Sequence, residues 1–490
     1  METGLSDIIK EIGVLQVKGD TGIRITGIAF DSRRVVPGVL FVAVRGSQTD
    51  GHDYIENAIE SGASAVICED LPTGVTGKAT LICVRDSSLA LGILASAYYG
   101  NPSTRFKLVG ITGTNGKTTT ITLLHRLFTA MGHKSGCFTT IRNYIGEQTV
   151  EATHTTPDPV QLNRIMKDMA DAGCAYVFME VSSHALAQQR VAGLKFAGGI
   201  FSNITHDHLD YHKTFDEYLK AKKLFFDNLP VGSFALINAD DRNGKIMVQN
   251  TKAEVSYYGI RSLADFKARI VESHADGTLL NMDNTELWTK FIGEFNAYNL
   301  LAVYSCACLL QHSKEKILKT LSSLDTVEGR FQYLRSADGV TAVIDYAHTP
   351  DAIMNVLKTI GRIRKGSSQV ITVIGAGGNR DKTKRPLMAQ VAADLSDKLI
   401  LTSDNPRDEE PADIIRDMKA GLDNRQTGKT ITQPDRLEAI KTACLLAKKG
   451  DIILIAGKGH ETYQEIRGIK HHFSDYEVVS SLFGTNTMNP

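Results

Sequence analysis

The sequence predicts an α/β protein of three domains in which strands alternate with helices. The chain has 490 residues, enough for about three domains of ordinary size. An apolar strand, a glycine-rich turn and an amphipathic helix follow one another over residues 106–131. In the last third of the chain, short apolar runs alternate with helical segments, which is typical of a parallel sheet.

The composition indicates a globular protein with several cores, since 42% of residues are hydrophobic and 22% charged. The formal net charge is zero, which argues against nucleic acid or an anionic membrane as the main partner. Seven cysteines without a C-x-x-C pair favour reduced thiols in a cytosol. No secretory signal and no apolar run long enough to span a bilayer is present. We therefore expect a cytoplasmic protein without a membrane span.

The first predicted unit covers residues 1–102. Its expected strands are residues 23–30, 39–44, 65–68 and 81–84. The polar loops at 31–38 and 47–52 are interpreted from the residues alone as surface connections, and residues 101–103 as a linker.

A glycine-rich turn at residues 110–120, reading Gly-Ile-Thr-Gly-Thr-Asn-Gly-Lys-Thr-Thr-Thr, predicts a phosphate-binding loop. An apolar strand at 106–109 precedes it and an amphipathic helix follows. The glycines let backbone N–H groups approach an anion, and the helix N-terminus adds partial positive charge. Lys117 could reach terminal phosphates and Thr118 could ligate Mg²⁺. The alternative is a glycine turn with an incidental lysine, because Ile111 stands where the standard motif has glycine.

Residues 103–331 also contain candidates for a metal site. Glu180 ends an expected strand at 176–179, where a carboxylate can hold Mg²⁺ directly or through water. The alternative is a solvated glutamate. Residues 205–212 contain three histidines and two aspartates. We interpret them as support for a Mg²⁺–nucleotide site rather than a zinc site, since no cysteine or second histidine pair lies near.

The last predicted unit covers residues 332–490. Its expected strands are 342–346, 370–374, 398–402 and 452–456, with helices near 351–363, 387–395, 414–422 and 436–447. Polar or glycine-rich loops follow these strands at 345–350, 375–380, 403–407 and 457–461. Ligands of parallel sheets bind just beyond the carboxyl ends of the strands, so these loops predict a binding site.

Together these loops resemble those of the Mur ligases, the ATP-dependent amide ligases that build the peptide stem of the bacterial cell wall. Residues 113–118 are similar to the family's nucleotide loop, which accounts for Ile111. The family's other motifs resemble, in the same order, the stretches around Glu180, His208, Asn299, Arg330 and Asp345. The resemblance spans nearly the whole chain. It implies a UDP-binding α/β domain at 1–102, a central P-loop ATPase-like domain with a parallel or mixed sheet at 103–331, and an amino-acid-binding, Rossmann-like domain at 332–490.

Within the family, the sequence is similar to the branch that adds the third stem residue to UDP-N-acetylmuramoyl-L-alanyl-D-glutamate. Residues 31–33, 155–157 and 404–407 carry this likeness. Enzymes that add meso-2,6-diaminopimelate have arginine at the end of the last motif, whereas those that add L-lysine typically lack it. A guanidinium binds the second carboxylate of diaminopimelate in bidentate fashion. Arg407 therefore favours diaminopimelate, with L-lysine or another diamino acid as the alternative.

The resemblance implies roles for individual residues. ATP would be held by Gly113, Thr114, Asn115, Gly116, Lys117, Thr118, Thr119, Asn299, Arg330 and Asp345. Two Mg²⁺ ions would be held by Thr118, Glu180, His208 and Lys222. The catalytic set would be Lys117, Glu180, His208 and Lys222. The UDP end would contact Ser32, Ser47, Gln48 and Thr49, and the muramoyl-dipeptide Thr155, Thr156, Ser182, Gln188 and Arg190. The amino acid would contact Arg380, Asp404, Asn405, Pro406, Arg407, Gly457 and Glu461.

Lys222 has a special role in this resemblance, because its surroundings are similar to the place where Mur ligases carry a carbamylated lysine. A carbamate turns the cation into an anion able to hold Mg²⁺. Composition alone would interpret Lys220, Lys222 and Lys223 as a solvated basic face.

The implied chemistry is activation of the D-glutamate γ-carboxylate by ATP to an acyl phosphate, followed by attack of the amino-acid amine. The expected partners are small molecules, and we expect a monomer. Two alternatives remain: another ligase of the same group, acting with L-lysine or on folate with glutamate, and a P-loop switch or motor ATPase without ligase chemistry.

Overall fold

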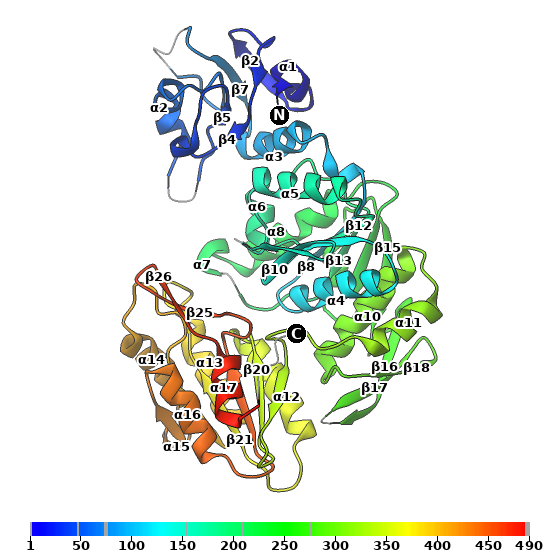
Figure 1. The fold of residues 1–490 in the computed structure, drawn as a ribbon, viewed down its shortest axis with the longest axis vertical. Helices are drawn as coiled ribbons and strands as arrows, with labels where there is room; N and C mark the ends of the chain where they lie inside the picture. Colours follow the sequence, from blue (N-terminus) through cyan, green and yellow to red (C-terminus); the bar gives the residue numbers. More distant parts are fainter. Residues whose placement is uncertain are drawn as a thin grey trace.

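Three large β-sheets follow one another along the chain in this computed structural model (Figure 1). The structure describes residues 2–46, 49–72, 77–152, 154–207, 209–274 and 276–485. The N-terminal sheet lies at one end of an elongated molecule, and the other two sheets lie next to each other toward the opposite end (Figure 1). The predicted α/β fold class is confirmed.

The first sheet has the strand order β2-β7-β6-β5-β4, parallel except for β2. Its strands are β2 (Val14–Lys18), β4 (Ile28–Ala29), β5 (Leu40–Val42), β6 (Ala65–Cys68) and β7 (Thr80–Val84), accompanied by helices α1 (Leu5–Ile8), α2 (Ile55–Glu60) and α3 (Ser87–Tyr98). The prediction of one strand over 23–30 is wrong. β3 (Arg24–Ile25) pairs with β1 (Thr3–Gly4) in a separate small sheet, whereas β4 pairs with β5, so the chain changes partners between them.

The second sheet has eleven strands in the order β11-β10-β9-β12-β8-β13-β14-β15-β16-β17-β18. At its centre β8 (Lys107–Thr112) pairs in parallel with β12 (Tyr176–Glu180) and β13 (Gly198–Phe201). The remaining strands are β9 (Ser135–Phe138), β10 (Arg142–Ile145), β11 (Gln148–Glu151), β14 (Phe234–Asn238), β15 (Glu254–Gly259), β16 (Phe266–His274), β17 (Gly277–Met282) and β18 (Thr285–Thr289). Antiparallel hairpins at both edges make the sheet mixed.

Helices cover both faces of the parallel part of this sheet. One face packs against α4 (Lys117–Ala130), α10 (Glu294–Leu309) and α11 (Lys314–Ser323), and the other against α5 (Pro159–Asp171), α6 (Ser183–Ala187) and α8 (Phe215–Asp227). Short helices α7 (Leu209–His212) and α9 (Gly244–Met247) lie in the connections. Burial on both faces explains why β8 is apolar almost throughout rather than alternating.

The third sheet has the order β19-β20-β24-β21-β22-β23 and is parallel except for β19. Its strands are β19 (Gln332–Arg335), β20 (Thr341–Asp345), β21 (Val370–Ile374), β22 (Lys398–Leu401), β23 (Thr430–Thr432) and β24 (Ile452–Ala456). Helices α12 (Pro350–Ile363), α13 (Lys384–Leu395) and α14 (Pro411–Lys419) cover one face, α16 (Arg436–Leu446) and α17 (Asp475–Phe483) the other, and α15 (Asn424–Gly428) leads into β23. A hairpin of β25 (Tyr463–Ile466) and β26 (Ile469–His472) lies beyond β24.

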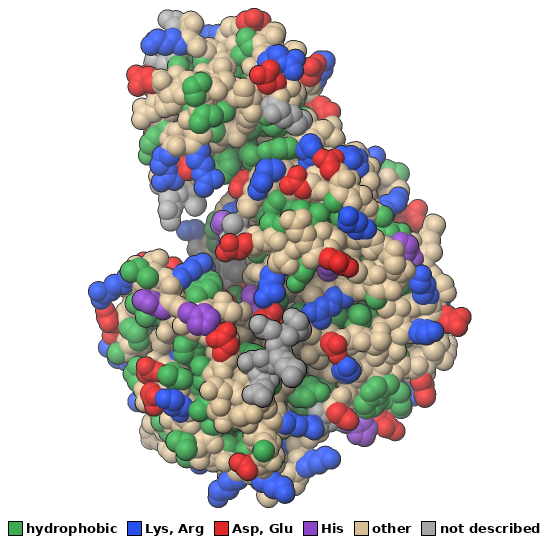
Figure 2. Space-filling model, in the orientation of Figure 1, with side chains coloured by type: hydrophobic (Ala, Val, Ile, Leu, Met, Phe, Trp, Pro, Cys, Tyr) green, Lys and Arg blue, Asp and Glu red, His purple; other side chains and the backbone are tan. Residues whose placement is uncertain are grey.

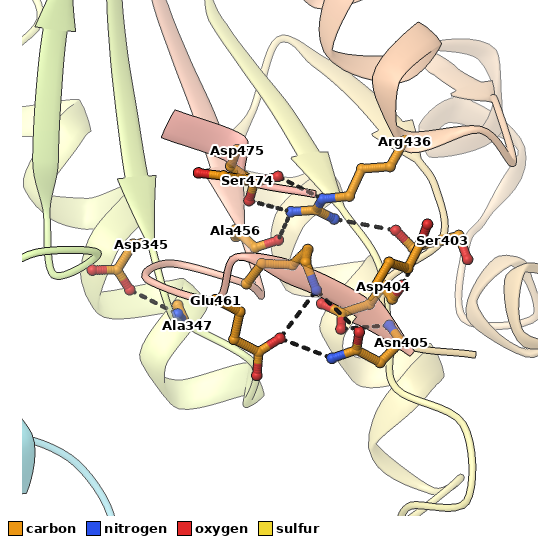
Figure 3. A network of polar contacts seen from close by, with 12 residues as sticks. Asp345, Ala347, Ser403, Asp404, Asn405, Arg436, Ala456, Glu461, Ser474 and Asp475 are labelled. Atoms are coloured by element: carbon orange, nitrogen blue, oxygen red, sulfur yellow. Dashed lines mark hydrogen bonds and ion pairs between the residues drawn. The ribbon is translucent and has the colours of Figure 1, made fainter. Parts of the chain in front are cut away.

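A buried ion pair ties together two strand ends of the third sheet. Arg436 and Asp475 are fully buried, and the guanidinium of Arg436 donates to both carboxylate oxygens of Asp475 at 2.8 and 2.7 Å. Arg436 also donates to the carbonyls of Ser403, just after β22, and Ala456, the last residue of β24, at 3.3 and 3.1 Å (Figure 3). The pair therefore holds the starts of two predicted binding loops side by side.

No helix among the described residues is long and apolar enough to cross a membrane. Charged side chains of both signs are mixed over the visible face, as the zero net charge requires (Figure 2).

Candidate active site

The loops that follow the parallel strands of the second and third sheets line one cleft of about 800 Å³. The surface is visibly hollowed where the parts of the molecule meet (Figure 2). The predicted site residues that line the cleft are Thr114, Asn115, Gly116, Lys117, Thr118, Thr119, Thr155, Thr156, Glu180, Ser182, Arg190, Lys222, Asn299, Arg330, Asp345, Arg380, Asp404, Asn405, Arg407, Gly457 and Glu461. Residues up to 347 positions apart in sequence thus share one cavity (from Thr114 to Glu461).

The predicted phosphate loop connects β8 to α4, and its backbone needs glycine at two positions. Gly113 has φ of +154°, and a Cβ there would lie 2.0 Å from the Ser202 hydroxyl. Gly116 has φ of +89°, and a Cβ there would lie 2.5 Å from Oδ1 of Asn299. Only glycine fits at both positions. The absence of a side chain there leaves the backbone N–H groups accessible to a ligand.

Two lysine ammonium groups meet at this loop. Nζ of Lys117 donates to the carbonyls of Gly113 and Thr114, each at 2.9 Å. Nζ of Lys222, on α8, donates to the same Gly113 carbonyl at 2.8 Å, and the Lys222 side chain is buried. Burial lowers the pKa of both lysines, and the charge of Lys117 lowers that of Lys222 further. An anion bound here would relieve that repulsion.

Glu180 is the last residue of β12 and is fully buried. Its Oε1 accepts a hydrogen bond from the backbone N–H of Thr140 at 2.9 Å, and the hydroxyl of Thr140 lies 3.3–3.4 Å from both carboxylate oxygens. The Thr140 hydroxyl also lies 3.1 Å from that of Thr155. The structure therefore excludes the alternative of a solvated strand-end glutamate.

The residues present fit a Mg²⁺ ion that is bound together with phosphates. The described residues contain no group of three or more His, Cys, Asp or Glu side chains that could hold a metal by themselves. Mg²⁺ needs no such group, since it is usually held by one or two carboxylates, substrate phosphates and waters. The buried carboxylate of Glu180 and the hydroxyl of Thr118, both in the cleft, are oxygen donors of this kind. His208 lies outside the described residues, so its metal role stays a prediction.

Arg330 reaches from the connection before β19 to the phosphate loop. Its Nη2 donates to the Thr118 hydroxyl at 3.1 Å, and its guanidinium carbon lies 4.4 Å from the centre of the Tyr346 ring. Its Nε is buried without a hydrogen-bond partner. A buried, unsatisfied donor beside the phosphate loop fits a ligand that supplies an acceptor. Asp345, at the end of β20, accepts the backbone N–H groups of Phe331 and Ala347, both at 2.7 Å.

The third sheet places Asp404, Asn405 and Glu461, three of the residues predicted to bind the amino acid, beyond the carboxyl ends of β22 and β24 (Figure 3). Asn405 donates through its amide nitrogen to Glu461 at 2.8 Å. Gly457 has φ of +115°, and a Cβ there would lie 2.5 Å from Oδ2 of Asp404, so only glycine leaves room for that carboxylate.

Arg407 has the left-handed backbone conformation, with φ of +52°. Two backbone hydrogen bonds hold it: its N–H donates to the carbonyl of Glu465 in β25 at 3.1 Å, and its carbonyl accepts from the N–H of Arg467, just after β25, at 2.8 Å. The guanidinium of Arg407 donates to the carbonyl of Gly378 at 2.8 Å and lies 3.4 Å from the Glu465 carboxylate. Arg380 is exposed on the neighbouring loop and also lines the cleft. Strained backbone held in this way is typical of a ligand site.

Models of three Mur ligase domains match the sequence along most of the chain. The sequence matches the Mur ligase middle domain over residues 111–307, the Mur ligase glutamate ligase domain over residues 329–459, and the catalytic domain of the Mur ligase family over residues 24–99. The chain belongs to the Mur ligase family.

Two relatives of this Mur ligase are named UDP-N-acetylmuramoyl-L-alanyl-D-glutamate–2,6-diaminopimelate ligase. They come from Bacteroides thetaiotaomicron and Phocaeicola vulgatus, and each is 57% identical over 479 residues, covering 98% of this chain and 99% of the relative. A solved structure of a protein with the same name is 32% identical, has a TM-score of 0.68 and covers 99% of both chains. The family resemblance predicted from the motifs is confirmed.

The residues expected in this Mur ligase to hold the muramoyl-dipeptide form a hydrogen-bonded group. Arg190 donates to the carbonyl of Thr156 at 2.8 Å and, through two nitrogens, to the amide oxygen of Gln188 at 3.0 and 2.7 Å. Thr156 accepts from the backbone N–H of Ser182 at 3.1 Å. Gln188 and Pro406 do not line the cleft itself, although their neighbours Arg190 and Arg407 do.

The residues expected to contact the UDP end lie in the first unit, away from the cleft. Ser32 is half-buried in a short 3₁₀ turn that Asp31 caps, and Thr49 is exposed. Neither lines the cleft. Ser47 and Gln48 lie outside the described residues. The roles of these four residues remain predictions.

Many residues that line the cleft were not among the predicted site residues of this Mur ligase, and three of them make polar contacts across it. Thr140 contacts Glu180, and Lys384 of α13 approaches Asp207 of the second unit to 3.9 Å. Asp207 belongs to the histidine-rich segment at 205–212, and this segment was the sequence feature that could have identified Asp207 as a site residue. Thr140 and Lys384 carry no motif signal, because only the tertiary fold brings them to the cleft.

Gly116 provides a test of the phosphate loop. Replacing it with alanine forces a Cβ into the left-handed backbone region, at a cost of about 1–2 kcal/mol, and pushes that Cβ against Asn299. We expect Gly116→Ala to raise the KM for ATP about tenfold, corresponding to about 1.4 kcal/mol. Steady-state kinetics with ATP as the varied substrate measures this.

Gly132, just after the same helix, offers a matched control. It has φ of +90°, but a Cβ there would meet nothing within 4 Å. Gly132→Ala should therefore lower thermal stability without changing the KM for ATP. Equal effects of both substitutions on that KM would contradict the assignment of the loop.

Proposed function

We propose that this Mur ligase joins meso-2,6-diaminopimelate to the D-glutamate of UDP-N-acetylmuramoyl-L-alanyl-D-glutamate, with ATP converted to ADP, in the synthesis of peptidoglycan precursors. The names of relatives at 57% identity support this proposal. The observation that carries it is Arg407, whose guanidinium is held at the cleft that also contains the phosphate loop. This arrangement suits an amino acid with a second carboxylate better than L-lysine.

The proposed chemistry needs ATP because a carboxylate does not react with an amine at neutral pH. Transfer of the γ-phosphoryl group to the γ-carboxylate of D-glutamate gives an acyl phosphate and ADP. The neutral amine of diaminopimelate then attacks the acyl carbon, and phosphate leaves with the electron pair of the broken C–O bond. The nitrogen loses one proton, to the leaving phosphate or to water, and an amide remains. Bound Mg²⁺ would neutralise phosphate charge in this process. Thr118 and Glu180 would hold one ion, and His208 and Lys222 the other.

The protein's part is to position groups and to neutralise charge. Lys117 is placed to move from the Gly113 and Thr114 carbonyls to a bound phosphate. Arg330 can serve the same anion, since its Nε has no partner. Contacts between the second and third units, such as Asn115 with Asp351 at 3.1 Å, would close the cleft and exclude water from the acyl phosphate.

Lys222 is suited to carbamylation because its pKa is lowered well below the usual range by burial and by Lys117. A neutral amine adds to CO₂, releases one proton and becomes an anionic carbamate. The carbamate nitrogen retains one hydrogen, so its bond to the Gly113 carbonyl can persist. The new negative charge would be compensated by Lys117 and a metal ion.

We also propose the domain limits 1–102, 103–331 and 332–490, because each range contains one complete sheet. The first domain would bind the UDP end through Ser32, Ser47, Gln48 and Thr49. A cytoplasmic location and a monomeric state complete the proposal, in keeping with substrates that are all small molecules.

The proposed function is tested by ADP release. Purified protein is given ATP, Mg²⁺ and the UDP-dipeptide, with meso-diaminopimelate, L-lysine or no amino acid. We expect ADP and the UDP-tripeptide in equal amounts with meso-diaminopimelate, and little of either without it. Faster amide formation with L-lysine would overturn the specificity, and product formed without ADP would overturn the mechanism.

Lys222→Ala should lose most activity, by a factor of about 10² or more, since an anion that neutralises the site is removed. Short carboxylates such as formate should restore part of that activity, because they can replace the carbamate. Lys220→Ala, an exposed lysine on the same helix, is the control and should retain wild-type rates. Full activity of Lys222→Ala would refute the carbamate role.

Arg407→Ala should raise the KM for diaminopimelate much more than the KM for ATP. Truncating one partner of a buried charge pair costs about 2–5 kcal/mol, which corresponds to at least about thirtyfold. Arg425→Ala, an exposed arginine of the same unit, serves as the control. An equal rise in both KM values would show that Arg407 does not contact the amino acid.

A further inference from the structure

Lys458 carries a fully buried ammonium group in the loop after β24. Its Nζ donates to Oδ1 of Asn405 at 3.0 Å and to Oε2 of Glu461 at 3.0 Å. Both partners line the cleft, whereas Lys458 does not. Lys458 therefore does not line the proposed amino-acid site. It contacts Asn405 and Glu461, which do line it.

The hydrogen bonds of this group determine how the Asn405 side chain is oriented. Oδ1 of Asn405 accepts from Lys458 and also from the backbone N–H of Glu465, at 2.9 Å. Both of its acceptor positions are thus occupied. The amide nitrogen is left to donate to Glu461 at 2.8 Å (Figure 3). Lys458 and Asn405 together hold one oxygen of the Glu461 carboxylate.

The charges around Glu461 do not balance. The carboxylates of Asp404 and Glu461 repel each other, the Lys458 ammonium pairs with Glu461, and Arg436 is already paired with Asp475. The other titratable groups here are the hydroxyls of Tyr346 and Tyr463 and the imidazole of His460. The nearby guanidinium groups each have an acidic neighbour, Glu465 for Arg407 and Asp345 for Arg330. One negative charge remains uncompensated at the cleft, so the site favours a ligand that brings one positive charge, such as a substrate ammonium.

Without a cation behind it, Glu461 would lose its charge easily. Burial and the neighbouring Asp404 raise the pKa of Glu461, and the charge of Lys458 opposes that rise. A protonated Glu461 could not form an ion pair with a substrate ammonium.

We propose that Lys458 is a positioning residue that keeps Glu461 ionised and aimed into the cleft, where Glu461 receives an ammonium group of the amino-acid substrate. The proposal rests on the proposed function and assigns to that site a residue that does not contact the substrate. A purely structural role of Lys458 predicts a different result. Replacing its buried ammonium with an apolar group of similar length would then change the stability of the protein, but it would not selectively weaken the binding of one substrate.

Two variants separate the charge of Lys458 from its hydrogen bond. Lys458→Met keeps an unbranched side chain of similar length without charge, and Lys458→Gln retains a donor for Asn405 without charge. For both we expect a rise of about thirtyfold or more in the KM for diaminopimelate, with kcat and the KM for ATP within about threefold of wild type. Lys449→Met, at an exposed lysine before β24, is the matched control and should behave as wild type.

The pH profile gives a second readout. Loss of the Lys458 charge raises the pKa of Glu461, so Glu461 becomes protonated at a higher pH. As pH falls, the KM for diaminopimelate should therefore begin to rise at a higher pH in Lys458→Gln than in wild type. In a Glu461→Gln background, the same Lys458 substitutions should have little further effect on that KM, because the group they serve is gone.

Thermal unfolding establishes whether each variant is folded. If Lys458→Met does not fold, the test uses Lys458→Gln alone. A folded Lys458→Gln with wild-type KM for diaminopimelate across pH 6–9 would overturn the proposal. So would equal rises in the KM values for diaminopimelate and ATP. A wild-type enzyme that forms no amide bond from diaminopimelate would instead refute the proposed function, and the two failures are thus distinguishable.

Discussion

Two lysine side chains, Lys117 and Lys222, donate to a single carbonyl oxygen, that of Gly113, and the cleft is built around this contact. Two ammonium groups at such short range repel each other, and burial removes the water that would screen them. The carboxylates of Glu180 and Asp207 offset part of this repulsion, and a partly neutral amine or a bound anion would reduce it further. Nucleotide phosphates and a carbamate on Lys222 each supply such an anion. The same electrostatic constraint therefore supports both the proposed phosphate site and the proposed carbamate on Lys222.

The phosphate loop is also the place where the second and third units make contact. Arg330 donates to Thr118, Asn115 donates to Asp351, and Lys384 approaches Asp207. The last two contacts join the second unit to the unit that carries Arg407 and Glu461, and Arg330 lies at the end of the second unit. Under the proposed function, a ligand that changes these contacts would couple nucleotide binding to amino-acid binding.

Much of the fold could be predicted from the sequence, because its apolar runs are bounded by clear turn residues. The strand before the phosphate loop, the strand that ends at Glu180 and the four strands at 342–456 were predicted close to their observed limits. The hairpins β16–β18 and β25–β26 were not predicted. The residues of β16 and of the β25–β26 hairpin are largely exposed or half-buried and have no strong apolar pattern. The continuous strand expected at 23–30 is divided because its two halves pair with different strands.

The sequence by itself predicted the chemistry of the site, because the glycines and Lys117 of the phosphate loop are recognisable from residue type and spacing and Arg407 from the family resemblance. The tertiary structure alone decided how that chemistry is controlled. Thr140 behind Glu180, Lys384 opposite Asp207 and Lys458 behind Asn405 come from segments distant in sequence or without a motif. Burial and the distances between charges govern pKa values and side-chain orientation, and both quantities exist only once the three sheets are assembled.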